Sequence, residues 1–387
     1  MAGRPRILLY TSVDAVGGAE VALGNLVGGL GGAYDVHVAG TDEPVVRWVA
    51  GHRPGVPYHV TGGGPLAHAR LLRRVRPDLV QANLEVPWAA PTMLGTALAL
   101  RGPRVVAVQH MAARTVDLPL LLRTRALALR LDANVAVSAD GARRVENFYA
   151  LGRDSVHVIH NGVPVPGQPV ASGGHVPGRP IARGGRVPGP GTPVGRAAGE
   201  IVVGCVGRLD AVKGQDVLID ALPRLPGVRV RLVGSGAREA ALRSQAARLG
   251  VADRVELTGW TDRVADQLHD MDVYCQPSRY ETLGLALIEA MGAGLPCVAS
   301  ATGGVPELLD AGRCGRLVPA GDAAALAEAI GRLATDPAAR QALGRQARER
   351  TLAAFTAERM AARYESLWAH VLAAPPARRL RPRPPKP

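Results

Sequence analysis

The stretch PSRYETLGLALIEAM, from Pro277 to Met291, carries two acidic residues across a turn that opens an apolar helix. Glu281 falls in the loop just before Gly284, and Glu289 lies more than one turn inside the helix. A fully helical path would separate the two by about 12 Å, at about 1.5 Å per residue. The free N–H groups between them favour an anion. The pattern therefore suits an elongated ligand with a sugar, a diphosphate and a ribose.

Outward from this stretch, short apolar runs alternate with helical patterns along both halves of the chain. This alternation predicts α/β domains, each with a parallel sheet covered on both faces. The strands expected in the first half are 6–10, 34–39, 78–82, 104–109, 133–138 and 155–160. Those expected in the second half are 201–207, 228–234, 254–259, 272–276, 296–300 and 315–319.

Composition divides the chain of 387 residues into four parts. Residues 1–162 and 200–373 are two doubly wound domains, the second including the terminal helices, and a ligand is expected in the cleft between them. Residues 163–199 are dominated by Pro and Gly, which predicts a disordered linker. Residues 374–387 form a basic, disordered tail.

The net charge of +13 does not indicate a nucleic-acid partner, because much of it lies in these two segments. Residues 163–199 hold four arginines and the tail five basic residues, with no acid in either. The remaining surface lacks the clustered basic face of a nucleic-acid reader. Buried free thiols are the expected form of the four cysteines, and no run is long enough to span a membrane. A cytoplasmic location is therefore expected.

Several motifs taken alone are ambiguous. Arg208 follows Gly207 at the end of a strand, and Lys213 precedes a helix. Two cations there suit a diphosphate leaving group, although a solvated surface pair explains them equally well. His110 follows a strand and either faces a ligand or caps the strand. Gly17-Gly18 lets the backbone approach a ligand or simply makes a βα turn.

The order of the motifs along the chain is more informative than any single one. The chain resembles glycosyltransferase family 4, the retaining nucleotide-sugar enzymes of the GT-B fold. The resemblance covers nearly all of the chain except the linker and tail. It rests on Gly17-Gly18-Ala19-Glu20, His110, Asn161-Gly162-Val163, Gly207-Arg208, Lys213-Gly214, Pro277-Ser278, Glu281-x7-Glu289, Gly294-x-Pro296 and Gly303-Gly304-x-Pro306-Glu307.

The resemblance implies a donor site in the second domain. Glu281 would bind hydroxyls of the donor sugar and Glu289 those of the ribose. Arg208, beside Gly207, and Lys213 would hold the diphosphate, helped by backbone N–H groups around two further residues, Gly284 and Leu285.

From the first domain, the resemblance implies that His110 orients the donor sugar and that Gly17 and Gly18 lie beside the donor phosphate and the acceptor. Family members need no metal or other cofactor. Leu283 and Gly292 depart from the residues that the family often has there, which bears on packing rather than charge.

The expected enzyme is thus a metal-independent hexosyltransferase that moves a hexose or amino-hexose from a nucleotide sugar, UDP-linked in most family members. A small soluble acceptor is expected, such as an aminocyclitol or aminoglycoside in antibiotic biosynthesis. The alternative is a membrane-associated transferase acting on a lipid or cell-envelope acceptor. It rests on residues 114–130, where leucines alternate with arginines.

Overall fold

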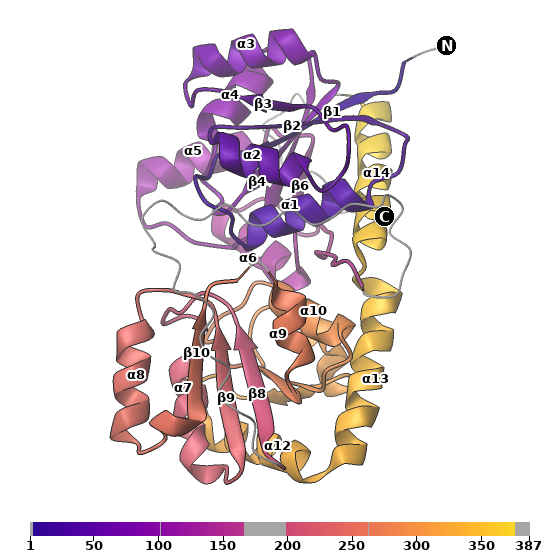
Figure 1. Ribbon diagram of the computed structural model, residues 1–387. Coiled ribbons are helices and arrows are strands. Elements are labelled where there is room, and N and C mark those ends of the chain that lie inside the picture. Colours follow the sequence, from indigo (N-terminus) through magenta and orange to yellow (C-terminus); the bar gives the residue numbers. More distant parts are fainter. Residues whose placement is uncertain (1–2, 101, 166–198, 262, 376–387) are drawn as a thin grey trace. The chain divides into compact units, whose positions relative to one another are not determined.

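The computed structural model describes residues 3–100, 102–165, 199–261 and 263–375 (Figure 1). These residues form two compact units. Unit 1 contains the chain up to Pro164 and returns at Ala357, and unit 2 contains the chain from residue 199 to Thr356. The expected disordered linker and tail fall almost wholly on residues outside the described ranges.

Unit 1 is built on a seven-stranded parallel sheet with the strand order β3-β2-β1-β4-β5-β6-β7. Ile7, Leu8, Leu9 and Tyr10 in the interior strand β1 are each at most 1% exposed, so both faces of the sheet are covered there. The strands are β1 (Arg6–Thr11), β2 (Asp35–Gly40), β3 (Tyr58–Val60), β4 (Leu79–Leu84), β5 (Arg104–Gln109), β6 (Ala133–Ala136) and β7 (Val156–Val158).

Helices connect these strands and close the core of unit 1. Leu71 and Leu94, on α3 and α4, pack with Leu8 and Tyr10 on one face of the sheet. Asp117 and other polar residues cap helix starts by accepting a backbone N–H. The helices are α1 (Gly18–Gly29), α2 (Glu43–Ala50), α3 (Pro65–Val75), α4 (Pro91–Leu100), α5 (Leu118–Ala128), α6 (Ala139–Tyr149) and α14 (Ala357–Ala373).

Unit 2 repeats the plan with a six-stranded parallel sheet in the order β10-β9-β8-β11-β12-β13. Its strands are β8 (Ile201–Val206), β9 (Val228–Val233), β10 (Val255–Gly259), β11 (Val273–Gln276), β12 (Cys297–Ser300) and β13 (Arg316–Val318). Its helices are α7 (Gln215–Ala221), α8 (Glu239–Arg248), α9 (Val264–His269), α10 (Leu285–Gly292), α11 (Val305–Leu308), α12 (Ala323–Thr335) and α13 (Pro337–Ala354), with short 3-10 turns η1 (Leu222–Arg224), η2 (Ala252–Arg254) and η3 (Asp310–Gly312).

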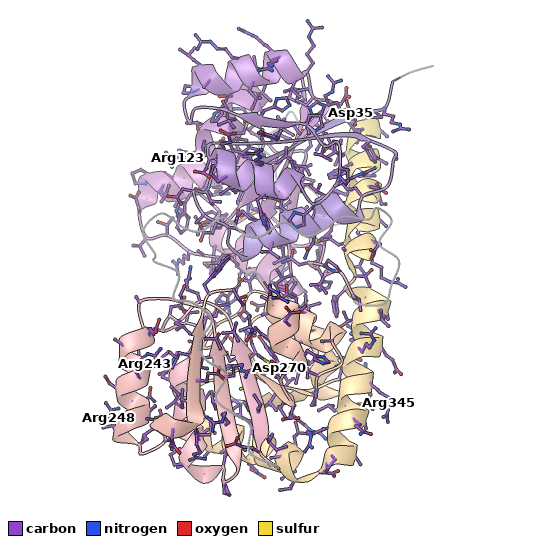
Figure 2. All side chains as sticks on the ribbon, viewed as in Figure 1. Asp35, Arg123, Arg243, Arg248, Asp270 and Arg345 are labelled. Atoms are coloured by element: carbon purple, nitrogen blue, oxygen red, sulfur yellow. The ribbon has the colours of Figure 1, made fainter. Side chains whose placement is uncertain are left out.

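Charged side chains of unit 2 project from the outer faces of these elements. Figure 2 shows Arg243 and Arg248 on α8, Asp270 after α9 and Arg345 on α13, all of them exposed. The four cysteines are buried and free, as the sequence predicted. No helix among the described residues is both long and apolar enough to cross a bilayer.

The last helix departs from the expected domain assignment. We expected the terminal helices up to Ala373 in the second domain, but α14 packs along α1 in unit 1. The buried Trp368 indole N–H donates to Gln81 Oε1 on β4 at 2.9 Å, and its ring meets Tyr34 edge-on. The buried face of α14, which includes Trp368, therefore packs on unit 1. Sequence periodicity identifies such a face without identifying what covers it.

Candidate functional site

The predicted donor residues lie on loops at one edge of the unit 2 sheet. Strands β8, β11 and β12 are neighbours in this parallel sheet, so their carboxyl ends meet. Arg208 and Lys213 lie in the loop after β8, and Glu281 lies in the loop after β11. This edge is where open α/β sheets bind their ligands.

Two glycines allow these loops to pack against each other. Gly214 has φ +68°, and a Cβ there would overlap the carbonyl oxygen of Pro277. Gly303 has φ +53°, and a Cβ there would overlap the carbonyl oxygen of Glu281. The backbone around Glu281 is thus held closely by the loop that follows β12.

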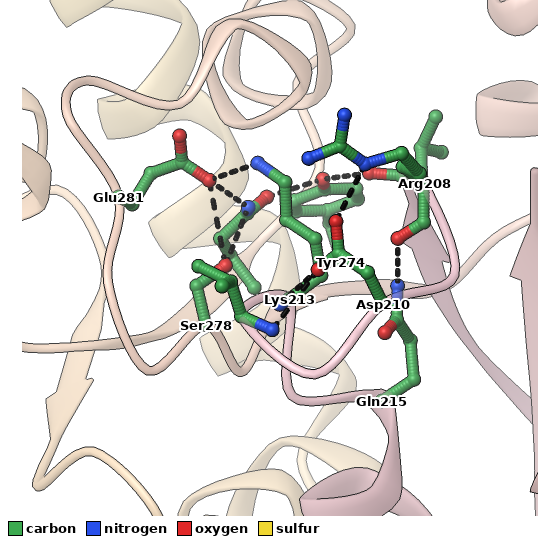
Figure 3. A network of polar contacts seen from close by, with 10 residues as sticks. Arg208, Asp210, Lys213, Gln215, Tyr274, Ser278 and Glu281 are labelled. Atoms are coloured by element: carbon green, nitrogen blue, oxygen red, sulfur yellow. Dashed lines mark hydrogen bonds and ion pairs between the residues drawn. The ribbon is translucent and has the colours of Figure 1, made fainter. Parts of the chain in front are cut away.

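A hydrogen-bond network fixes the Glu281 carboxylate (Figure 3). Its Oε2 accepts from Lys213 Nζ at 2.6 Å, from Gln276 Nε2 at 2.9 Å and from Ser278 Oγ at 3.4 Å. Gln276 is itself held, because its Oε1 accepts from the buried Tyr274 hydroxyl at 2.6 Å. The carboxylate is therefore pre-positioned by groups on two loops and a strand.

The same network leaves polar atoms available for a ligand. Glu281 Oε1 makes no hydrogen bond within the part of the chain that the structure describes, and Figure 3 shows it directed away from Lys213. The Glu281 and Lys213 side chains are 11% and 27% exposed. An ammonium has three N–H donors, and the Glu281 contact uses one of Lys213's. The pair thus presents an acceptor and cationic donors side by side.

Arg208 presents a second cation on the same loop. Its Nε donates to Asp210 Oδ2 at 2.6 Å, and its side chain is 66% exposed. Asp210 Oδ1 also accepts the backbone N–H groups of Val212 and Lys213 at 3.0 Å. Burial opposes ionisation of Asp210, but the Arg208 hydrogen bond and the Lys213 N–H outweigh it and lower its pKa. The Asp210 carboxylate is therefore ionised and held in place, and it orients the Arg208 guanidinium group.

Helix α10 starts where the sequence predicted. Gly284 is its N-cap residue with φ +98°, a conformation that favours glycine, and Leu285 is the first helical residue. Backbone N–H groups at this end have no partner in the helix. Glu289 lies one turn further along and is half-buried. The two glutamates thus occupy the loop and helix positions expected of them.

The predicted residues of unit 1 occupy the corresponding edge of its own sheet. Gly17 is the N-cap of α1 and Gly18 its first residue, directly after β1. Glu20 accepts from the Gly17 N–H at 3.1 Å and from the Thr11 hydroxyl at 3.0 Å. Burial raises the pKa of Glu20, which is 3% exposed. The glycine turn is therefore fastened by a buried carboxyl group.

His110 follows β5, separated from β1 by one strand. Its imidazole Nε2 is enclosed and makes no hydrogen bond within the described residues. Burial lowers the pKa of His110 to about 4, so the ring is neutral at physiological pH. On β4 beside it, Asn83 Nδ2 is likewise enclosed without a partner among those residues. Buried polar atoms of this kind usually mark a ligand or an ordered water.

Three polar residues at these two sheet edges were not singled out from the sequence: Gln276 and Asp210 in unit 2 and Asn83 in unit 1. A polar residue that ends an otherwise apolar strand, as Gln276 does in β11, is a signal that could have identified one of them. For a metal, the described residues contain no group of three or more His, Cys, Asp or Glu side chains suitably placed.

Comparisons with known proteins bear on the family and the fold. Residues 200–336 match the family described as "Glycosyl transferases group 1", and residues 16–165 match "Glycosyltransferase Family 4". The chain resembles HepE of Anabaena in complex with UDP-glucose, with a TM-score of 0.78, 22% identity and coverage of 94% of this chain and 99% of that one. This likeness shows the GT-B fold, with two Rossmann-like domains.

Curated relatives are similar over different lengths. D-inositol 3-phosphate glycosyltransferase of Mycobacteroides abscessus is 42% identical over 146 residues, which are 36% of this chain and 33% of the relative. This relative and three other similar glycosyltransferases are covered by the chain over only 33% to 49% of their own length. Phosphatidyl-myo-inositol mannosyltransferase of Mycobacterium leprae is 33% identical over 276 residues, 69% of this chain and 67% of that protein. The chain therefore belongs to glycosyltransferase family 4.

Proposed function

We propose that the protein is a retaining, metal-independent hexosyltransferase that moves a hexose or amino-hexose from a nucleoside-diphosphate sugar, UDP-linked, to a hydroxyl group. The observation that carries this proposal is the Lys213–Glu281 pair. A carboxylate oxygen without a protein partner lies beside an ammonium with unused donors. That combination suits a sugar hydroxyl joined to a phosphate.

We assign to each donor residue the role that the family resemblance implies. Arg208 and Lys213 hold the diphosphate and stabilise the negative charge that grows on it as the sugar bond breaks. Glu281 accepts from hydroxyls of the donor sugar. The backbone N–H dipoles of Gly284 and Leu285 also stabilise the negative charge of the phosphate.

Glu289, inside α10, binds the ribose hydroxyls. Neither glutamate serves as a nucleophile: Glu281 is held at Oε2 by three donors, an arrangement that suits binding rather than attack. In unit 1, the neutral His110 ring orients the donor sugar, and Gly17 and Gly18 let the backbone approach the donor phosphate and the acceptor.

A panel of nucleotide sugars incubated with candidate acceptors and read by mass spectrometry tests the proposal. A glycosylated product formed in EDTA with the anomeric configuration of the donor is the expected result. Hydrolysis alone across the whole panel, or transfer with inversion, would contradict it.

For the acceptor, we propose a small soluble polyol of the aminocyclitol or aminoglycoside class, met in the cytoplasm during antibiotic assembly. The support is compositional: 46 basic residues include only two lysines, a bias typical of a GC-rich genome. Aminocyclitols belong in the acceptor panel for this reason.

A surface of unit 1 favours a second candidate, transfer to a lipid acceptor at a membrane. Val116 is 98% exposed, Leu118 60% and Leu122 54%, and they flank the start of α5. Arg123 projects from this helix (Figure 2) and is exposed. Exposed apolar residues beside a cation suit an anionic bilayer.

A vesicle flotation assay separates the two candidates. Association with anionic vesicles that is lost in Leu118→Ser/Leu122→Ser would favour the lipid acceptor. Failure of the wild-type chain to float with such vesicles would favour the soluble one. The relative from M. leprae is named for a phosphatidyl-myo-inositol substrate, which makes lipid acceptors worth including.

A further inference from the structure

A groove of about 360 Å³ lies between the edge strand β3 and helix α3 of unit 1. Its polar lining comes from Tyr58, His59 and Thr61 on the strand side and from Arg70 and Arg74 on the helix. The other lining residues are Val, Ala, Leu and Gly. Among the residues that the structure describes, no acid lines the groove.

The two arginines have unused hydrogen-bonding capacity. Arg70 and Arg74 are one helical turn apart and therefore lie on the same side of α3. Both are exposed, and neither makes a hydrogen bond or an ion pair among the residues that the structure describes. Two guanidinium groups converging on one groove without an acid favour an anionic ligand.

His59 lines the same groove and is connected to a carboxylate. Its Nε2 lies 2.9 Å from His37 Nδ1, and the two rings are parallel within 7°. His37 Nε2 in turn lies 3.3 Å from Asp35 Oδ1. When His37 Nε2–H donates to Asp35, His37 Nδ1 accepts from His59 Nε2–H, and the second ring nitrogen of His59, Nδ1, is left for a ligand.

The charge state of His59 depends on what occupies the groove. Burial lowers its pKa, as do the neighbouring His37 and Arg74. The other charged groups around it are Arg70 on α3 and, beyond His37, Asp35 on β2. An anion between Arg74 and His59 would offset the repulsion from the guanidinium and favour the imidazolium.

We propose that the groove between β3 and α3 binds a small phosphomonoester, such as a sugar phosphate, with Arg70 and Arg74 on the phosphate and His59 donating to it. A phosphate offers three non-ester oxygens, enough for two guanidinium forks and an imidazolium, whereas a carboxylate offers two. The groove lies within the size range of small-molecule sites, so it has room for more than the phosphate. The Tyr58 ring, 39% exposed, supplies an apolar face for the rest of the ligand.

This site is separate from the proposed transfer site. In the sheet, β3 is two strands away from β1, which precedes Gly17 and Gly18, and four strands away from β5, or about 10 Å and about 19 Å at the usual strand spacing. His110 follows β5, and the donor residues belong to unit 2. The inference therefore does not rest on the proposed function.

Isothermal titration of the full-length chain with glucose 6-phosphate, with glucose as the neutral control, tests the site. We expect binding of glucose 6-phosphate alone, weakened about tenfold or more by Arg70→Gln or Arg74→Gln. The matched control is Arg73→Gln, which removes a charge from the same helix at an exposed position outside the groove lining. This control should bind within about twofold of wild type.

Several outcomes would overturn the proposal. Equal weakening by Arg73→Gln would mean general attraction to a basic helix. A loss caused by Lys213→Gln, with Arg74→Gln unaffected, would place the phosphate in unit 2. Binding to phosphatidic acid vesicles without binding to glucose 6-phosphate would mean that Arg70 and Arg74 contact a membrane surface instead of a small phosphomonoester.

A pH series isolates the contribution of His59. Glucose 6-sulfate is the probe, because a sulfate ester keeps one charge throughout the range. Wild-type affinity should rise severalfold from pH 8 to pH 6, and His59→Gln should flatten this rise without changing circular dichroism. An equal rise in affinity in His59→Gln would mean that His59 does not contact the ligand.

Discussion

Replacing Glu281 with glutamine tests the donor site at its most connected residue. The side chain keeps its shape, and the amide oxygen can still accept from Lys213 and Gln276 in place of Oε2. The amide NH2 must then occupy the position of Oε1. The ligand thus loses a charged acceptor, and Lys213 loses the ion pair.

The magnitude follows from these contacts. A hydrogen bond to a charged group contributes about 1.5–3 kcal/mol and a neutral one about 1 kcal/mol, so the donor sugar should lose about 1–1.5 kcal/mol, roughly a tenfold drop in kcat/KM. With the carboxylate only 11% exposed, loss of its charge should also lower the free energy of unfolding by about 1–3 kcal/mol.

Binding of the nucleoside diphosphate without sugar separates this reasoning from a general loss of structure. Glu281→Gln should bind it at least as tightly as wild type, because the Lys213 ammonium remains and is no longer neutralised by a carboxylate. Titration calorimetry with the diphosphate and the sugar nucleotide measures both affinities. Arg243→Gln, which breaks an exposed ion pair on α8, is the control and should change neither. A parallel loss of both ligands, or unchanged turnover, would refute the assignment.

Three further predictions concern stability. Gly303→Ala should lower the free energy of unfolding in urea by about 1–3 kcal/mol more than Gly321→Ala. Both glycines have positive φ, but only at Gly303 would the added Cβ overlap a carbonyl oxygen. Equal losses in the two variants would contradict the close approach of the loops. Trp368→Phe should lower the free energy of unfolding by about 1–3 kcal/mol, because Gln81 Oε1 loses its hydrogen-bond donor. An unchanged midpoint of thermal denaturation would mean that water replaces the indole N–H. His110, with a pKa of about 4 in the folded chain against an ordinary value of 6.5, binds its proton more tightly when unfolded. Stability should therefore fall by up to about 3 kcal/mol as pH drops from 6.5 to 4, and His110→Asn should remove that part of the slope in urea titrations.

The sequence predicted both sheets well because their strands are buried on both faces. All six strands expected in the second half occur. Five of them differ from the expected range by one residue at one end, and β13 differs by one residue at each end. The strand Tyr58–Val60 was missed, because it is a three-residue edge strand with two exposed side chains and no apolar run.

Side-chain partnerships were harder to predict. Lys213 and Glu281 are 68 residues apart, and no local pattern indicates that the ammonium bonds the carboxylate. The assignment of α14 to unit 1 depends on the same kind of information, since Trp368 meets Gln81 across 287 residues. Non-local contacts of this type are determined by the three-dimensional fold, whereas periodicity reports only the local face.

The return of the chain to unit 1 has a consequence for synthesis. The ribosome adds about 5–20 residues per second, so about 10–40 s pass between Pro164 and Ala357. During this interval the face of α1 that packs on α14 has no cover, and Gln81 lacks its indole donor. Unit 2 can fold first, although it is made second. Released chains truncated after Thr356 should accordingly show a protease-sensitive unit 1 beside a protected unit 2.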